Sequence, residues 1–161
     1  SNLVGILGRV WQNQAVGRQI RDFLTPLQPV LIAFEGYALG ASKFRGHHDI
    51  VEHGYELRRM LCALEPQPRF IELPATTLKR HATGAGNAEK AAMVSKMVKR
   101  FPDHNFETDD EADAAALALF GLQAMGFAEP ANEIQRDSFT KICGEWRPAE
   151  QSAPVAEEAP Y

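Results

Sequence analysis

Apolar residues recur along this chain in two alternating patterns, amphipathic helices and short continuous runs. Spacings of three and four predict a helix over residues 10–27, which proline residues end. A short apolar run at 30–34 follows, as expected of a strand buried on both faces. The same patterns predict a loop at 40–49, helices at 50–64, 88–100 and 109–125, a strand at 69–73 and a turn at 83–87. Helices that alternate with short apolar strands predict an α/β domain.

The length and composition fit one ordinary domain with a C-terminal extension. The chain has 161 residues, of which 45% are hydrophobic, enough to form a core. The segment 126–161 contains several prolines, and its last part, 148–161, holds no basic residue, so we expect that part to be disordered. No apolar run approaches the roughly 20 residues of a membrane span. We therefore expect no membrane partner. The two cysteines show no disulfide or metal spacing, which favours reduced thiols and a cytoplasmic protein.

Charge is distributed unevenly, although the whole chain carries a net charge of only −4. Residues 1–102 hold 14 basic and 8 acidic residues, a net +6, whereas residues 103–161 hold 3 and 13, a net −10. Segment 76–101 has six basic residues against one glutamate, interleaved with threonine, asparagine and glycine. Such donors are typical of phosphate binding. A solvated helix face is the alternative, and composition leaves both interpretations open.

The run from Thr108 to Phe120 joins an acidic stretch to an apolar one. Asp110 and Asp113 lie three residues apart and therefore share one face of the predicted helix. Two carboxylates that converge beside an apolar surface repel each other unless a cation neutralises them, and Mg²⁺ is the usual partner of such oxygens. Thr108 and Glu111 also match a capping box, and acidic residues near a helix N-terminus complement its dipole. Helix capping and metal binding are therefore both open interpretations of this run.

Glu35 directly follows the predicted strand 30–34. Open α/β sheets bind their ligands outside the carboxyl ends of the strands, so a carboxylate at this place is a candidate ligand. A surface glutamate at a strand–loop junction is the alternative, because most charged residues are exposed.

Taken in order, these motifs resemble the RuvC family of Holliday junction resolvases, particularly its compact phage-type members. The resemblance covers about residues 10–125. It depends on an apolar strand that ends in Glu35, on the segment from Pro74 to Lys90 with its Thr-Gly-Ala-Gly-Asn-Ala-Glu-Lys run, and on the closing Asp-x-x-Asp-Ala element at Asp110. It implies an RNase H-like nuclease domain over residues 1–125, with a central mixed sheet flanked by helices.

The resemblance also implies roles for individual residues. Glu35, Asp110 and Asp113 correspond to metal ligands of the family, and Lys79 and Lys90 to its two functional lysines. Two Mg²⁺ ions, for which Mn²⁺ substitutes, are the implied cofactors.

DNA contacts are expected from the basic segment and from the loop after Glu35. The family often places an apolar aromatic residue three positions after its glutamate to wedge the junction open. That position is Ala38 here, with aromatic residues nearby. The expected DNA-binding residues are Lys43, Arg45, Lys79, Arg80, Lys90, Tyr37 and Phe44.

One feature of an RNase H-like fold is not found in the sequence. The fold opens with a three-stranded sheet whose first strand carries an essential aspartate, and nothing before residue 10 fits such a strand. We therefore expect the N-terminal strands, about 50 residues, to be missing from this sequence. The implied function is metal-dependent cleavage of four-way (Holliday) or branched DNA junctions by a homodimer, in a host cytoplasm if the protein is phage-encoded. The alternative is a non-catalytic RNase H-like DNA-binding or assembly module.

Overall fold

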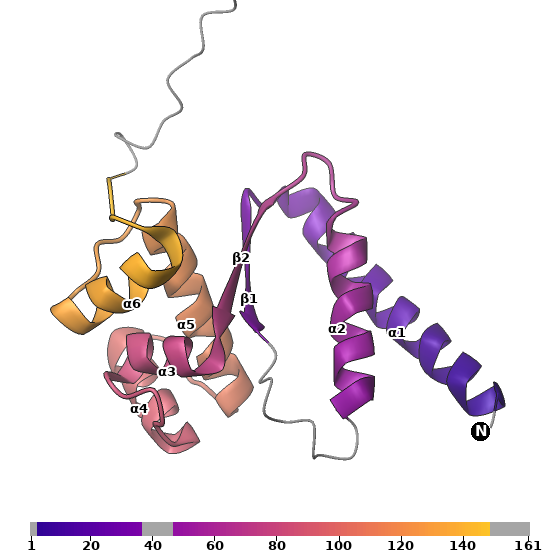
Figure 1. The fold of residues 1–161 in the computed structure, drawn as a ribbon, viewed down its shortest axis with the longest axis horizontal. Helices are drawn as coiled ribbons and strands as arrows, with labels where there is room; N and C mark the ends of the chain where they lie inside the picture. The colour runs from indigo at the N-terminus through magenta and orange to yellow at the C-terminus, as the bar shows by residue number, and fades with distance from the viewer. Residues whose placement is uncertain (1–2, 37–46, 149–161) are drawn as a thin grey trace, which may run out of the picture. The chain divides into compact units, whose positions relative to one another are not determined.

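The structure, a computed structural model, describes residues 3–36 and 47–148, and the side chains of residues 12–36 and 51–148. Its elements are, in chain order, α1 (Leu3–Leu24), the 3₁₀ helix η1 (Thr25–Leu27), β1 (Leu31–Gly36), α2 (His47–Leu61), β2 (Arg69–Pro74), α3 (Ala75–Thr83), α4 (Lys90–Arg100), α5 (Asp109–Ala124) and α6 (Glu133–Cys143) (Figure 1). Helices predominate, and β1 and β2 pair as a two-stranded parallel sheet. The α/β class is confirmed. The larger mixed sheet is not found in the described residues, and the RNase H-like assignment stays a prediction.

The predicted elements agree with the structure except at a few places. The first helix begins at Leu3 rather than at residue 10. Strand β1 continues to Gly36, so Glu35 lies within the end of the strand and not after it. Of the predicted loop 40–49, residues 40–46 lie outside the described residues, and His47 already begins α2. Helices α3 and α6 were not predicted at all.

The chain divides into two compact units, and the first comprises residues 1–32 and 37–71. In this unit α1 packs along α2. Gly17 permits the close approach, because a Cβ atom there would lie only 2.7 Å from the Sδ atom of Met60. The imidazole Nδ1 of His53 on α2 lies 3.0 Å from Asn13 Oδ1 on α1. No helix in the described part of the chain combines the length and the apolar character needed to cross a membrane.

The second unit comprises residues 33–36 and 72–161 and contains the predicted carboxylates and lysines. Its core lies where α5 packs against α3, α4 and α6. Phe120 on α5 is fully buried, with its ring centroid 4.9 Å from that of His81 and 5.4 Å from that of Phe139. From α4, Met93 and Met97 complete this core. Burying apolar side chains of this size contributes about 1.5–3 kcal/mol each.

Capping interactions mark the end of α3 and the start of α6, the two helices that were not predicted. Helix α3 ends at Gly84, whose φ of 96° suits glycine and whose N–H donates to the Arg80 carbonyl. Helix α6 begins after Asn132, whose side chain accepts a hydrogen bond from the backbone N–H of Gln135 at 2.9 Å. Helix α6 lies within the predicted C-terminal extension, and it packs against α3 in the second unit. Residues 149–161, which include nearly all of the segment expected to be disordered, lie outside the described residues.

Candidate functional site

The N-terminus of α5 is capped by its own side chains. Thr108 Oγ1 accepts a hydrogen bond from the backbone N–H of Glu111 at 3.2 Å. The carboxylate of Glu111 in turn accepts one from the backbone N–H of Glu107 at 2.8 Å. The capping interpretation is thus confirmed for Thr108 and Glu111. Asp110 and Asp113 take no part in this cap, so the cap does not account for them.

The carboxylates of Glu35 and α5 form one electrostatic cluster. Partial burial raises the pKa of Glu35, and the negative charges of Asp113 and Asp110 raise it further. Partial burial also raises the pKa of Asp113, as do the charges of Asp109 and Asp110. Glu35 comes from the end of β1 and the aspartates from the first turns of α5, so residues about 75 positions apart repel each other at one place. We define Glu35, Asp109, Asp110 and Asp113 as the carboxylate cluster.

Two lysines from separate helices act on this cluster. The charge of Lys79 on α3 lowers the pKa of both Glu35 and Asp113, against the effect of burial. Lys90, at the start of α4, forms an ion pair with Asp109. This contact raises the pKa of Lys90 and lowers that of Asp109. The charge of Lys90 also lowers the pKa of Asp113.

Sequence reasoning missed one member of the cluster. Asp109 was seen as part of an acidic run, but no role was assigned to it. The signal was its spacing: Asp109 lies four residues before Asp113, and positions i and i+4 share a helix face. Asp109 is the member that holds Lys90 beside the cluster.

The other predicted residues lie elsewhere or are not described. The guanidinium of Arg80 pairs with the carboxylate of Asp137 on α6 at 2.8 Å, so it is not part of the cluster. The remaining predicted DNA contacts and the wedge position lie outside the described residues, namely Tyr37, Ala38, Lys43, Phe44 and Arg45.

The donor chemistry of the cluster fits a hard divalent cation. Carboxylate oxygens that raise one another's pKa are held together at an electrostatic cost, which Mg²⁺ or Mn²⁺ offsets. Among the described residues, no three His, Cys, Asp or Glu side chains are gathered closely enough to hold an ion as they stand. Because like charges repel, a coordination sphere built from Glu35, Asp110 and Asp113 requires them to approach one another further.

Comparison with known proteins identifies no relative. No protein-family model matches this chain, and no curated protein matches it.

Proposed function

We propose that this protein is a metal-dependent endonuclease that cuts four-way or branched DNA junctions and acts as a homodimer. The observation that carries the proposal is that the negative charge of Asp113 on α5 raises the pKa of Glu35 on β1. These two carboxyl groups come from different elements, both have a raised pKa, and both respond to the charge of Lys79. Perturbed carboxylates with adjacent lysines are typical of phosphoryl-transfer sites.

Each member of the cluster has a role that follows from its contacts. Glu35, Asp110 and Asp113 would hold two Mg²⁺ ions, or Mn²⁺ in their place. When bound, such a pair activates a water molecule and stabilises the leaving oxygen of a phosphodiester.

The lysines divide two tasks between them. Lys79 favours the ionised form of Glu35 and Asp113, which is the form that binds a cation. In the described residues no ion pair engages Lys79, so its ammonium group is available to a phosphate oxygen. Lys90 is oriented by Asp109 and offsets negative charge at the same cluster.

The test is cleavage of a synthetic four-way junction by the full-length protein, with Mg²⁺ and with a chelator. We expect Asp113→Asn to lower the rate of cleavage by about 10²-fold or more, as for loss of a preorganised electrostatic group. Glu111→Gln is the matched control, because it removes an acidic charge from the same turn of α5 while keeping an acceptor for the Glu107 N–H. Equal Mg²⁺-dependent rates for wild type and Asp113→Asn would contradict the proposal.

A second candidate function is a DNA-binding module without catalysis. The separation of the carboxylates in the described residues favours it, because they do not gather as a ready-made metal site. This alternative predicts junction binding that is unchanged by Mg²⁺ and by Asp113→Asn, with no cleavage in any divalent metal. Size-exclusion chromatography with light scattering checks the homodimer in the same preparation.

A further inference from the structure

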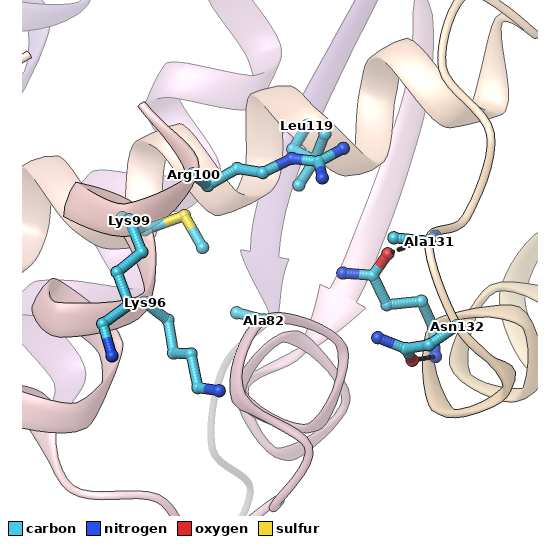
Figure 2. A pocket seen from close by; sticks show the side chains of 9 residues that line it. Ala82, Lys96, Lys99, Arg100, Leu119, Ala131 and Asn132 are labelled. Atoms are coloured by element: carbon cyan, nitrogen blue, oxygen red, sulfur yellow. Dashed lines mark hydrogen bonds between the residues drawn. The ribbon is translucent and has the colours of Figure 1, made fainter. Parts of the chain in front are cut away.

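A second basic feature of the second unit lies apart from the carboxylate cluster. A pocket of about 260 Å³ opens between the C-terminal half of α4, the C-terminal end of α3, α5 at Leu119, and the start of α6 (Figure 2). Its α4 wall carries three cationic side chains, Lys96, Lys99 and Arg100, and its opposite wall carries two amides, Asn132 and Gln135. Figure 2 shows Arg100 reaching along α5 over Leu119.

The three cations have no anionic partner among the described residues. No acidic side chain lines the pocket. Other basic side chains of the same unit are paired, as the contacts of Arg80 with Asp137 and of Lys90 with Asp109 show. Basic residues in a last helical turn also complement the helix dipole, which is the ordinary explanation for Lys99 and Arg100. The helix dipole does not, however, account for the pocket beside these residues or for the amide side chains on its opposite wall.

The amide wall is held in place by hydrogen bonds. Gln135 is buried, its Oε1 accepts from the Ala131 N–H at 2.8 Å, and its Nε2 donates to the His81 carbonyl at 3.2 Å. Asn132 uses its Oδ1 to cap α6, which leaves its amide N–H groups as donors toward the pocket. The pocket thus combines exposed cationic side chains on one wall with the amide of Asn132, which its capping hydrogen bond holds in place, on the other.

We propose that this pocket binds a phosphate group of a nucleic-acid backbone, at a point remote from the carboxylate cluster. The inference rests on the proposed function for the identity of the nucleic acid. The chemistry is that of phosphate recognition, with charge from lysine and arginine and a neutral side-chain donor. The volume is below the roughly 300–1,000 Å³ typical of pockets for drug-sized ligands, so a single charged group suits it better than a whole nucleotide.

Helix α4 fixes the separation of the two sites. Lys90 at its start adjoins the carboxylate cluster, whereas Lys99 near its end lines the pocket. Nine residues of α-helix span about 14 Å at a rise of 1.5 Å per residue. Neighbouring phosphates of a DNA strand lie closer together than this, so the two sites would hold different phosphates. The pocket would therefore hold a phosphate a few positions at most from the one at the cluster.

The variants that test the pocket change its charge in two ways. Lys96→Gln, Lys99→Gln and Arg100→Gln together remove the cations. Ala131→Glu instead places a carboxylate in the pocket and keeps every basic side chain, since Ala131 is an exposed lining residue. The matched control is a triple variant with the same loss of charge at exposed arginines that do not line the pocket, namely Arg18→Gln, Arg69→Gln and Arg147→Gln.

The first measurement is junction binding against salt concentration in the presence of a chelator, so that no DNA is cut. We expect the pocket triple variant and Ala131→Glu each to weaken binding about tenfold, and the triple variant to reduce the slope of log affinity against log salt by about one. The control triple variant should do neither to this extent. Equal losses in the pocket and control triple variants would overturn the proposal, because they would reflect net charge alone.

The second measurement places single neutral methylphosphonates along the DNA strand. We expect a substitution at one position within a few nucleotides of the cleavage position to weaken binding by wild type and by the control triple variant, but not by the pocket triple variant. If no methylphosphonate substitution at any position weakens binding by the wild-type protein, the proposal that the pocket binds a phosphate is refuted.

The two proposals fail separately. If wild type cuts junctions with Mg²⁺ but the pocket variants bind like the control, the pocket is refuted and the nuclease stands. If no metal supports cleavage, but the pocket triple variant and not the control reduces the slope of log affinity against log salt, the pocket proposal holds for a protein that only binds DNA.

Discussion

At the scale of the residue, one helix face holds two aspartates with opposite properties. Asp109 and Asp113 lie four positions apart on α5, yet the pKa of Asp109 is lowered by its hydrogen bond with Lys90, whereas burial raises that of Asp113. Residue type therefore says little about which carboxylate is relieved of repulsion. Burial and the contact with Lys90 decide it, and the two carboxyl groups whose pKa stays raised are those of Glu35 and Asp113.

The raised pKa values of Glu35 and Asp113 lead to a prediction about the stability of the metal-free protein. The folded-state pKa values of Glu35 and Asp113 lie above their unfolded values near 4, so the free energy of unfolding falls as pH rises through the window between them. Above this window both carboxyl groups are ionised, and Asp113→Asn then removes a charge that is partly buried and that neighbouring aspartates repel. We expect the metal-free variant to be about 0.5–1 kcal/mol more stable than wild type, raising Tm by roughly 1–4 °C.

Thermal unfolding in a chelator, at pH 7 and below pH 4, measures this effect. The gain should disappear at the lower pH, where both carboxyl groups are protonated in the wild type. Asp103→Asn, at an exposed position outside the cluster, should show no such gain. A metal-free Asp113→Asn protein that is less stable than wild type at pH 7 would show that Asp113 makes a net favourable contact.

Lys79 gives a second prediction, on the pH dependence of cleavage. Its positive charge lowers the pKa of both Glu35 and Asp113, so Lys79→Met should raise both values further. A higher pH is then needed to ionise the two carboxylates, and the acidic limb of the rate profile should move to higher pH. The measurement is the cleavage rate at saturating junction from pH 5 to 9. Lys141→Met is the control, because Lys141 pairs with Asp137 and does not act on the cluster. If the acidic limb of the rate profile lies at the same pH in Lys79→Met as in wild type, Lys79 does not set the ionisation of the carboxylates that catalysis requires.

At the scale of the element, apolar patterns in the sequence predicted most of the strands and helices but not the short helices α3 and α6. Both strands and four of the helices were predicted from apolar runs and periodicity. Helix α3 was missed because it is short and its buried face consists of only Leu78 and a histidine, His81. Helix α6 was missed because the prolines and acidic residues of segment 126–161 indicated an extension without regular structure. Asn132 before the helix and Gly144 after it are nevertheless typical cap residues.

The same limit explains how much of the site was predicted. The carboxylates and lysines of the cluster lie in motifs, so a resemblance located them, whereas Asp109 required knowing that Lys90 lies against α5. The basic pocket was not predicted, because one of its walls belongs to α6. A cavity between elements cannot be read from a sequence in which one of the elements is not recognised.

The cap of α5 gives a prediction about this element. Thr108 fixes where α5 begins and therefore the direction in which Asp110 and Asp113 point. Thr108→Ala should cost about 1 kcal/mol of unfolding free energy, or roughly 2–4 °C in Tm, while Thr108→Ser should retain most of the stability. Because the proposed metal ligands are not part of the cap, Thr108→Ala should still be stabilised by Mg²⁺ in thermal unfolding. Loss of that response in Thr108→Ala but not in Thr108→Ser would mean that the cap assembles the site.

At the scale of the whole chain, the charge asymmetry of the sequence does not appear as a basic body with an acidic tail. The acidic helix α5, the basic helices α3 and α4, and α6, whose acidic and basic residues balance, belong to the same compact unit. Ion pairs join them, as Lys90 does with Asp109 and Arg80 with Asp137. Within the described part of this unit, charges of one sign still gather at two places, the carboxylates of the cluster and the cations of the pocket.

This separation predicts that the two sites contribute independently to DNA binding. The pocket lies about 14 Å along α4 from Lys90, and effects of sites farther apart than 7–10 Å usually add within about 0.5 kcal/mol. The pocket triple variant should thus weaken junction binding by the same factor in wild type and in Asp113→Asn, measured at fixed salt in a chelator. Lys79→Met combined with Asp113→Asn is the contrasting pair, because the charge of Lys79 acts on Asp113 directly, and its effects should not add. A coupling of more than about 1 kcal/mol between pocket and cluster would mean that one phosphate contacts both, and that the two basic regions form a single site.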